Sequence, residues 1–231
     1  MQHAMSSDWL DALHLSSASL PVGGFAYSQG LEQACACGRV TDVASAQHWI
    51  SDYLQLVVAR QELPWWHAIA QACAQTNWDK ALELSQSLAA LRETAELRLE
   101  STQMAHAMVK LYEQWLDPDY LELLPVELKQ ALANDYTAAH AGLCAARGLS
   151  VEIGMSAWVW SWLDNQVLAA VKLVPLGQRH GQQMLHALKT HVPAVIEQGM
   201  QTPLDQAGCA AFGLMLASTQ HETQYARLFR S

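Results

Sequence analysis

Histidine and cysteine side chains are the groups in this 231-residue chain that could bind a metal ion. Ten histidines are present, but none forms an HExxH pair, and the closest two, His186 and His191, are poorly placed to share one helical face. Cys35 and Cys37 form a CxC pair, which is found in some soft-metal sites, although two thiolates complete only half of a tetrahedral coordination sphere. The alternative is that both are small buried hydrophobic residues, because residues two apart in a helix point about 200° from each other. We therefore predict no bound metal and no cofactor.

Motifs for nucleotide binding and for nucleophilic catalysis are absent from the sequence. No GxxxxGK[ST] loop is present to bind phosphates through its backbone amides. Ser28 follows Tyr27 without a GxSxG elbow. The remaining catalytic alternative pairs His106 with Glu100 or Glu96 as acid and base, and no spacing supports it. We predict that the chain is not an enzyme.

The composition predicts one domain over residues 1–231. Hydrophobic residues make up 51% and charged residues 15%, a balance that excludes a disordered chain. The formal charge of −9 gives no attraction to nucleic acid or to anionic lipid. The odd cysteine count of five, the absence of a signal-like N-terminus and the absence of a long apolar segment predict a cytoplasmic protein with no membrane association.

Helix-forming residues dominate between Leu20 and Pro175, which predicts an all-α single-domain bundle of about eight to ten helices. The segment 151–173 carries Trp158 and Trp162 on one helical face and Trp160 nearly opposite, so we expect a buried central helix there, with a strand over 158–163 as the alternative. The expected helices cover residues 28–37, 43–60, 63–75, 79–91, 93–115, 125–147, 151–173, 178–191 and 206–218.

Two segments contain polar, aromatic or basic residues that core packing does not explain. LPVGGFAYSQGLE, which begins at Leu20, fits either a tight turn before a helix or a binding loop with exposed Phe25 and Tyr27. In the final HETQYARLFRS, two arginines flank Leu228 and Phe229. Ordering such a segment costs about 1 to 2 kcal/mol per residue, more than its few apolar side chains return. We therefore expect a flexible tail over 220–231 that depends on a partner for its order, and a disordered segment over 1–7.

Four stretches of the chain resemble the urease accessory protein UreF family, in the order and at the spacing of that family. They are LHLSSASLPVGGFAYSQGLE, RETAELRLES, WLDNQVLAAVKLVPLGQ and HETQYARLFRS. The resemblance implies an all-α, typically dimeric protein without catalytic activity. It also implies that the protein joins UreD (UreH in some systems) and the GTPase UreG on apo-urease and helps to deliver nickel. A metallochaperone that stores nickel directly on histidine and cysteine is the alternative.

The resemblance also implies partner-binding residues. It assigns the tail to UreD, and the N-terminal glycine loop, which is the stretch LPVGGFAYSQGLE, to UreG or the dimer interface. These residues are Phe25, Tyr27, Ser28, Gln29, Glu32, Arg92, Glu93, Lys172, Gln178, His221, Glu222, Gln224, Tyr225, Arg227, Leu228, Phe229 and Arg230.

Overall fold

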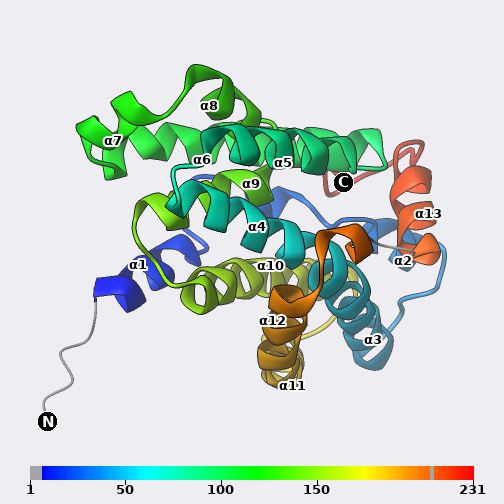
Figure 1. Ribbon diagram of the computed structural model, residues 1–231. Helices are drawn as coiled ribbons and strands as arrows, with labels where there is room; N and C mark the ends of the chain where they lie inside the picture. The colour runs from blue at the N-terminus through cyan, green and yellow to red at the C-terminus, as the bar shows by residue number, and fades with distance from the viewer. Residues whose placement is uncertain (1–6, 209–210) are drawn as a thin grey trace, which may run out of the picture.

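A computed structural model describes residues 7–208 and 211–231, and these residues form helices joined by loops, with no strand among them (Figure 1). The predicted all-α class is therefore confirmed. The α-helices are α1 (Ser7–Leu15), α2 (Leu31–Ala36), α3 (Val43–Tyr53), α4 (Leu63–Ala74), α5 (Trp78–Ala90), α6 (Ala95–Trp115), α7 (Pro118–Leu123), α8 (Val126–Leu132), α9 (Tyr136–Ala146), α10 (Val151–Leu173), α11 (Gln178–Leu188), α12 (Val192–Gln201) and α13 (Phe212–His221).

Helix α10 is the central helix that the tryptophan pattern predicted. The Ser150 hydroxyl caps it by accepting a hydrogen bond from the Ile153 amide. Trp158 and Trp162 are buried, whereas Trp160 is exposed to solvent. Helices from both halves of the chain, including α1, α3, α4, α9 and α11, pack against α10. The helix interpretation is thus confirmed over the strand alternative.

Residues 43–74 form one continuous helical rod instead of two separate helices. A π-helical segment, Leu54–Glu62, joins α3 to α4 where the sequence predicted a break. Pro64 has no amide hydrogen to donate to the Arg60 carbonyl, and its ring crowds that carbonyl in an α-helix. The Gly208 amide donates to the Arg60 carbonyl instead, at 3.1 Å. The wider turn of the π-segment therefore accommodates the proline without ending the rod.

Several predicted boundaries were wrong. The expected helix over 125–147 is divided into α8 and α9, because Asp135 takes an extended conformation and caps α9 through the Ala138 amide. The helix expected from 28 begins only at Leu31, since Gly30 before it has a left-handed φ of 84°. Helices α1, α7 and α12 were not predicted, and α13 begins at Phe212, later than expected.

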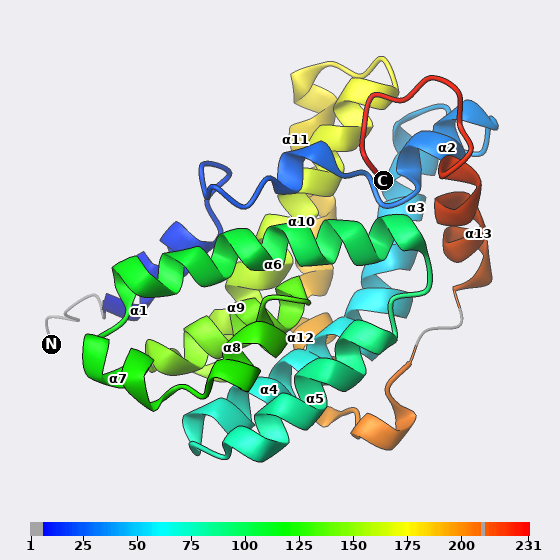
Figure 2. The same ribbon diagram turned by 90° about the horizontal axis from the view of Figure 1, so that it is seen from above.

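The first helix, α1, and the last residues of the chain lie at opposite ends of the molecule. Helices α1 and α7 occupy one end, and α2 and α13 occupy the other, where the final residues also lie (Figures 1 and 2). Residues 222–231, called the tail below, follow α13 without a helix or strand. Of the segment 1–7 expected to be disordered, residues 1–6 lie outside the described part, and Ser7 begins α1. Across the described ranges, every helix is too short or too polar to span a membrane.

Candidate functional site

The tail and the N-terminal glycine loop lie side by side and exchange backbone hydrogen bonds. The Arg230 amide donates to the Ala26 carbonyl at 2.9 Å, and the Ser28 amide donates to the main-chain oxygen of Ser231 at 2.8 Å. The Ser28 hydroxyl donates to the same oxygen at 2.6 Å. Residues from the two ends of the sequence therefore form one surface next to α2, as Figure 2 shows.

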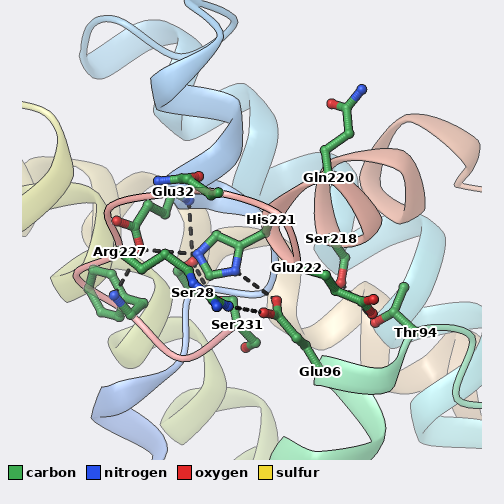
Figure 3. Close-up of polar contacts among 12 residues, drawn as sticks. Ser28, Glu32, Thr94, Glu96, Ser218, Gln220, His221, Glu222, Arg227 and Ser231 are labelled. Carbon is green, nitrogen blue, oxygen red and sulfur yellow. Dashed lines mark hydrogen bonds and ion pairs between the residues drawn. The ribbon is translucent and has the colours of Figure 1, made fainter.

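A buried histidine joins three helices beneath the tail. His221 ends α13 and is inaccessible to solvent. Its Nδ1 lies 2.7 Å from Oε2 of Glu96 in the first turn of α6, and its Nε2 lies 3.2 Å from Oε2 of Glu32 in the first turn of α2. Figure 3 shows the ring between the two carboxylates. Ion pairs of this kind stabilise a fold only when their geometry repays the cost of desolvation.

The same two carboxylates bind the tail. Glu32 accepts hydrogen bonds from the Leu228 amide at 2.6 Å and from the Phe229 amide at 2.8 Å. Glu96 accepts a hydrogen bond from Arg227 at 2.5 Å. Apolar burial alone was not expected to order this segment, but charge-assisted hydrogen bonds within the chain also hold it in the structure. His221, Glu32, Glu96 and Arg227 are called the His221 cluster below.

The last residue is bound by a second buried carboxylate. The Ser231 hydroxyl donates to Oε2 of Glu100 at 2.6 Å, and Gln29 donates to its Oε1 at 2.7 Å. Gln29 in turn accepts a hydrogen bond from the Trp162 indole at 2.8 Å. Burial raises the pKa of Glu100 to about 7, although the two donors act in the opposite direction. This carboxyl group therefore changes its protonation near neutral pH.

A cavity of about 60 Å³ lies between the glycine loop, α6 and α10, with Glu100 in its wall. It has room for a few water molecules, since one water needs about 10 to 15 Å³. Trp158 also lines the cavity, and its buried indole N–H has no hydrogen-bond acceptor among the described residues.

Arg92 lies in a buried ion network, away from the tail. It donates to Asp135 at 2.7 Å and to both oxygens of Glu62. Thr137 and Ser101 donate to these carboxylates at 2.7 and 3.0 Å. Burial opposes the charge of the guanidinium group, but the two carboxylates outweigh it and raise the pKa of Arg92. Arg92 and Glu96, which lie four residues apart, form no ion pair with each other, because both side chains have other partners.

The predicted partner-binding residues differ in exposure. Tyr27, expected to be exposed, is buried and donates to Gln103 at 2.6 Å, whereas Phe25 is 63% exposed as predicted. Lys172 places its amine 5.5 Å from the ring centroid of Phe229. The exposed members of the set are Phe25, Glu93, Lys172, Gln178, Tyr225, Arg227, Leu228 and Arg230; Gln29, Arg92, Glu222 and Gln224 are half-buried, and Tyr27, Ser28, Glu32, His221 and Phe229 are buried.

Sequence reasoning missed Glu96, Glu100 and Ser231 as parts of this site. The two glutamates lie four residues apart in the charge-rich stretch RETAELRLES. Their spacing did place them on one side of a helix. Nothing local to that stretch indicated that residues from the other end of the chain cover this side.

The cysteines and histidines do not gather into a metal site in the described ranges, where no group of three or more His, Cys, Asp or Glu side chains could hold an ion. Cys37 is exposed and Cys35 half-buried, while Cys73 and Cys144 are buried. Cys209 lies outside the described residues.

Comparison with known proteins matches residues 40–189 to the UreF family model. The chain belongs to the UreF family. It is 42% identical over 221 residues to the urease accessory protein UreF of Pseudomonas fluorescens strain Pf-5, covering 95% of this chain and 97% of that protein. The UreF proteins of Azoarcus sp. strain BH72 and of Cupriavidus necator are 41% and 40% identical over 95% and 96% of this chain, covering 94% and 97% of those proteins.

The part of the chain matched by the UreF family model contains Arg92, Lys172 and Gln178. The glycine loop and the tail lie outside it, one on each side. In this UreF-family chain, the surface next to α2 is therefore built from the segments that flank the matched region.

Proposed function

We propose that this chain is a non-catalytic adaptor in urease maturation, which binds UreD or UreH, the GTPase UreG and apo-urease in the cytoplasm and regulates nickel delivery. We also propose that it acts as a homodimer. Family membership over nearly the whole chain supports a role as a urease accessory protein. The individual partners follow from the resemblance of the glycine loop and the tail to that family.

The surface formed by the glycine loop and the tail is the observation that carries this proposal. Tyr225 is fully exposed and Leu228 is 66% exposed, although both are large side chains that favour burial. Arg227 and Arg230 border them and line a groove between α6 and the tail, close to the exposed Leu99. Exposed aromatic, aliphatic and arginine side chains on one surface are the composition of binding hot spots.

We assign the tail to UreD and the glycine loop to UreG or the dimer interface. Buried members of the predicted set, such as Ser28, Glu32 and His221, act as positioning residues, because they hold the backbone of the exposed members. The amine of the exposed Lys172 lies 5.5 Å from the centroid of the buried Phe229 ring and stabilises this part of the tail. The remaining exposed residues, Glu93 and Gln178, would contact partners outside this surface.

Regulation of nickel delivery requires that the adaptor distinguish the nucleotide states of UreG. A difference in binding of about 1 to 3 kcal/mol between the GTP and GDP states is enough to time hydrolysis. Calorimetry with UreG loaded with each nucleotide measures this difference. Equal affinities would exclude a gating role, since a ligand shifts an equilibrium only through differential binding.

A pull-down of UreD and UreG tests the assignment of the tail. The chain that ends at Thr219 and the double variant Y225S/L228S should both lose UreD and keep UreG. The double variant is the sharper test, because both side chains are exposed, whereas the truncation also removes His221. L123S/V126S changes two apolar side chains at the opposite end, each about as exposed as Leu228, and should keep both partners. Unchanged UreD binding by Y225S/L228S would refute the tail assignment.

A nickel titration of the isolated chain separates the adaptor from a metallochaperone. The adaptor predicts weak binding that histidine and cysteine substitutions do not change. Tight stoichiometric binding that is lost on such substitutions would favour nickel storage.

A further inference from the structure

The exposed face of helix α11 carries positive charge and no negative charge. From residue 165 to residue 196 the chain contains no aspartate or glutamate, although its formal net charge is −9. The same stretch contains Lys172, Arg179 and Lys189, and all three are exposed. Acidic and basic residues are thus separated along the sequence, and α11 lies within the segment that has no acidic residue.

The period of the helix places its polar residues on one side. Arg179 and His186 lie seven residues apart, which is close to two helical turns, and both are exposed. The exposed Gln182 and Gln183 lie between them, and Lys189 extends this face beyond the last residue of α11. The other side of α11 is buried, and the helix packs against α10 and α3; its buried residues are Gly181, Met184, Leu185 and Leu188. The solvent side of α11 therefore consists of cationic, imidazole and amide groups.

The cations of this face have no carboxylate partner within the described part of the chain. No ion pair there includes Arg179 or Lys189. Solvent-accessible cations on other helices differ, since Lys80 and Lys129 each pair with a glutamate, at 2.9 and 3.2 Å. The positive charge of α11 is thus available to a group from outside the chain.

The acidic side chains on the two helices packed against α11 do not neutralise this face. Helix α3 contributes Asp52, which pairs with His48 at 3.4 Å, and α10 contributes Glu152 and Asp164. Across residues 7–208 and 211–231, none of these three carboxylates pairs with a cation of α11. The tail differs, because Arg227 of the His221 cluster is paired with a carboxylate of that cluster.

The size of the face favours a short acidic segment over a nucleic acid or a membrane. Helix α11 has 11 residues and is therefore about 16 Å long. A nucleic acid or an anionic bilayer extends further than this and would meet the acidic remainder of the chain, because screening removes repulsion only beyond about 10 Å at 0.1 M salt. A short segment with a few carboxylates avoids that repulsion. Helix α11 lies at the edge of the molecule, where such a segment can reach it (Figures 1 and 2).

We propose that the exposed face of α11, from Gln178 to Lys189, is a docking surface for an acidic segment of a partner protein. Arg179 and Lys189 attract the carboxylates of this segment, and Gln182 and Gln183 donate hydrogen bonds to it. Exposed charge pairs of this kind contribute more to specificity and to the rate of association than to affinity. The test does not depend on the proposed function, because a synthetic polypeptide replaces the partner.

Titration of the ¹⁵N-labelled full-length chain with poly-L-glutamate, followed by NMR at neutral pH and low salt, tests the proposal. We expect the largest changes in amide chemical shift within α11. Raising the salt concentration from about 0.05 M to about 0.5 M should weaken binding at least about tenfold, because salt screens exposed charges.

Charge reversal on α11 identifies the cations that bind the probe. R179E/K189E should weaken binding of poly-L-glutamate at least about tenfold, because two attractive pairs become repulsive. Both side chains are exposed and have no ion pair, so the variant should keep its fold, which circular dichroism checks. R39E/K110E is the matched control: it changes the net charge equally at two exposed cations outside α11 and should weaken binding less than about twofold.

Four results would overturn the proposal. One is the absence of measurable binding to poly-L-glutamate at low salt. Another is binding whose shift changes lie in the tail or elsewhere outside α11. Equal weakening by R179E/K189E and R39E/K110E is the third, since it would show that net charge alone governs binding. The fourth is binding of poly(U) RNA to α11 as tight as that of poly-L-glutamate, which would assign this face to nucleic acid.

Discussion

Replacement of Glu100 by glutamine should stabilise the protein at alkaline pH and leave it unchanged at acidic pH. The side chain is buried and its pKa is raised to about 7. Glutamine has the same shape, and its oxygen can accept from Gln29 while its amide donates to the Ser231 hydroxyl. The substitution therefore removes the charge and keeps both hydrogen bonds.

The direction follows from proton binding in the two states. The folded protein holds the Glu100 proton more tightly than the unfolded chain, in which a glutamate has its ordinary pKa of 4.5. The unmodified protein therefore has its full stability below about pH 4.5 and loses part of it as the pH rises to about 7. Each tenfold difference in proton affinity corresponds to about 1.4 kcal/mol, so the loss amounts to about 3 kcal/mol.

Urea unfolding followed by tryptophan fluorescence, at several pH values between 4 and 8, measures this difference. The free energy of unfolding of E100Q minus that of the unmodified protein should be close to zero at the acidic end. It should approach about 3 kcal/mol in favour of E100Q at pH 8. E122Q, which changes an exposed glutamate on α7, is the control and should show no such trend. Parallel pH profiles for E100Q and the unmodified protein would refute a buried, titrating Glu100.

Two further predictions concern the core. R92A should lower the free energy of unfolding in urea by about 3 to 5 kcal/mol, because Glu62 and Asp135 lose the cation that compensates their charges. The control R179A, at an exposed arginine, should lower it by less than about 0.5 kcal/mol. A similarly small effect of R92A would contradict a buried ion network. G154A should lower the free energy of unfolding by about 1 to 3 kcal/mol, because the added Cβ would lie 2.6 Å from the Trp66 ring. The control G213A adds a Cβ in open space and should stabilise α13 by up to about 1 kcal/mol. A stabilising effect of G154A would show that α4 and α10 are not closely packed at this position.

The central helix and the general helical content could be predicted from sequence because their signals are local. The tryptophans of α10 report burial through their spacing within one helix, and Ser150 marks its start. The break between α8 and α9 was missed, since Asp135 has a role both as a helix cap and as a ligand of the distant Arg92. The rod through Pro64 was missed because the amide that replaces the lost donor comes from Gly208.

The composition of the site was decided by the tertiary structure. The tail and the glycine loop were identified in the sequence as unusual, and the family resemblance implied a role for Arg92, but the contacts of all three were not predicted. His221 and Glu32 lie 189 positions apart, and His221 and Glu96 lie 125 apart. Periodicity and helix propensity act over a few residues, whereas burial of a charge depends on which distant segment brings its partner. The sequence alone thus determined the helical class, the central helix and the segments that carry the family likeness, and the folded chain determined which of their charged groups are buried together.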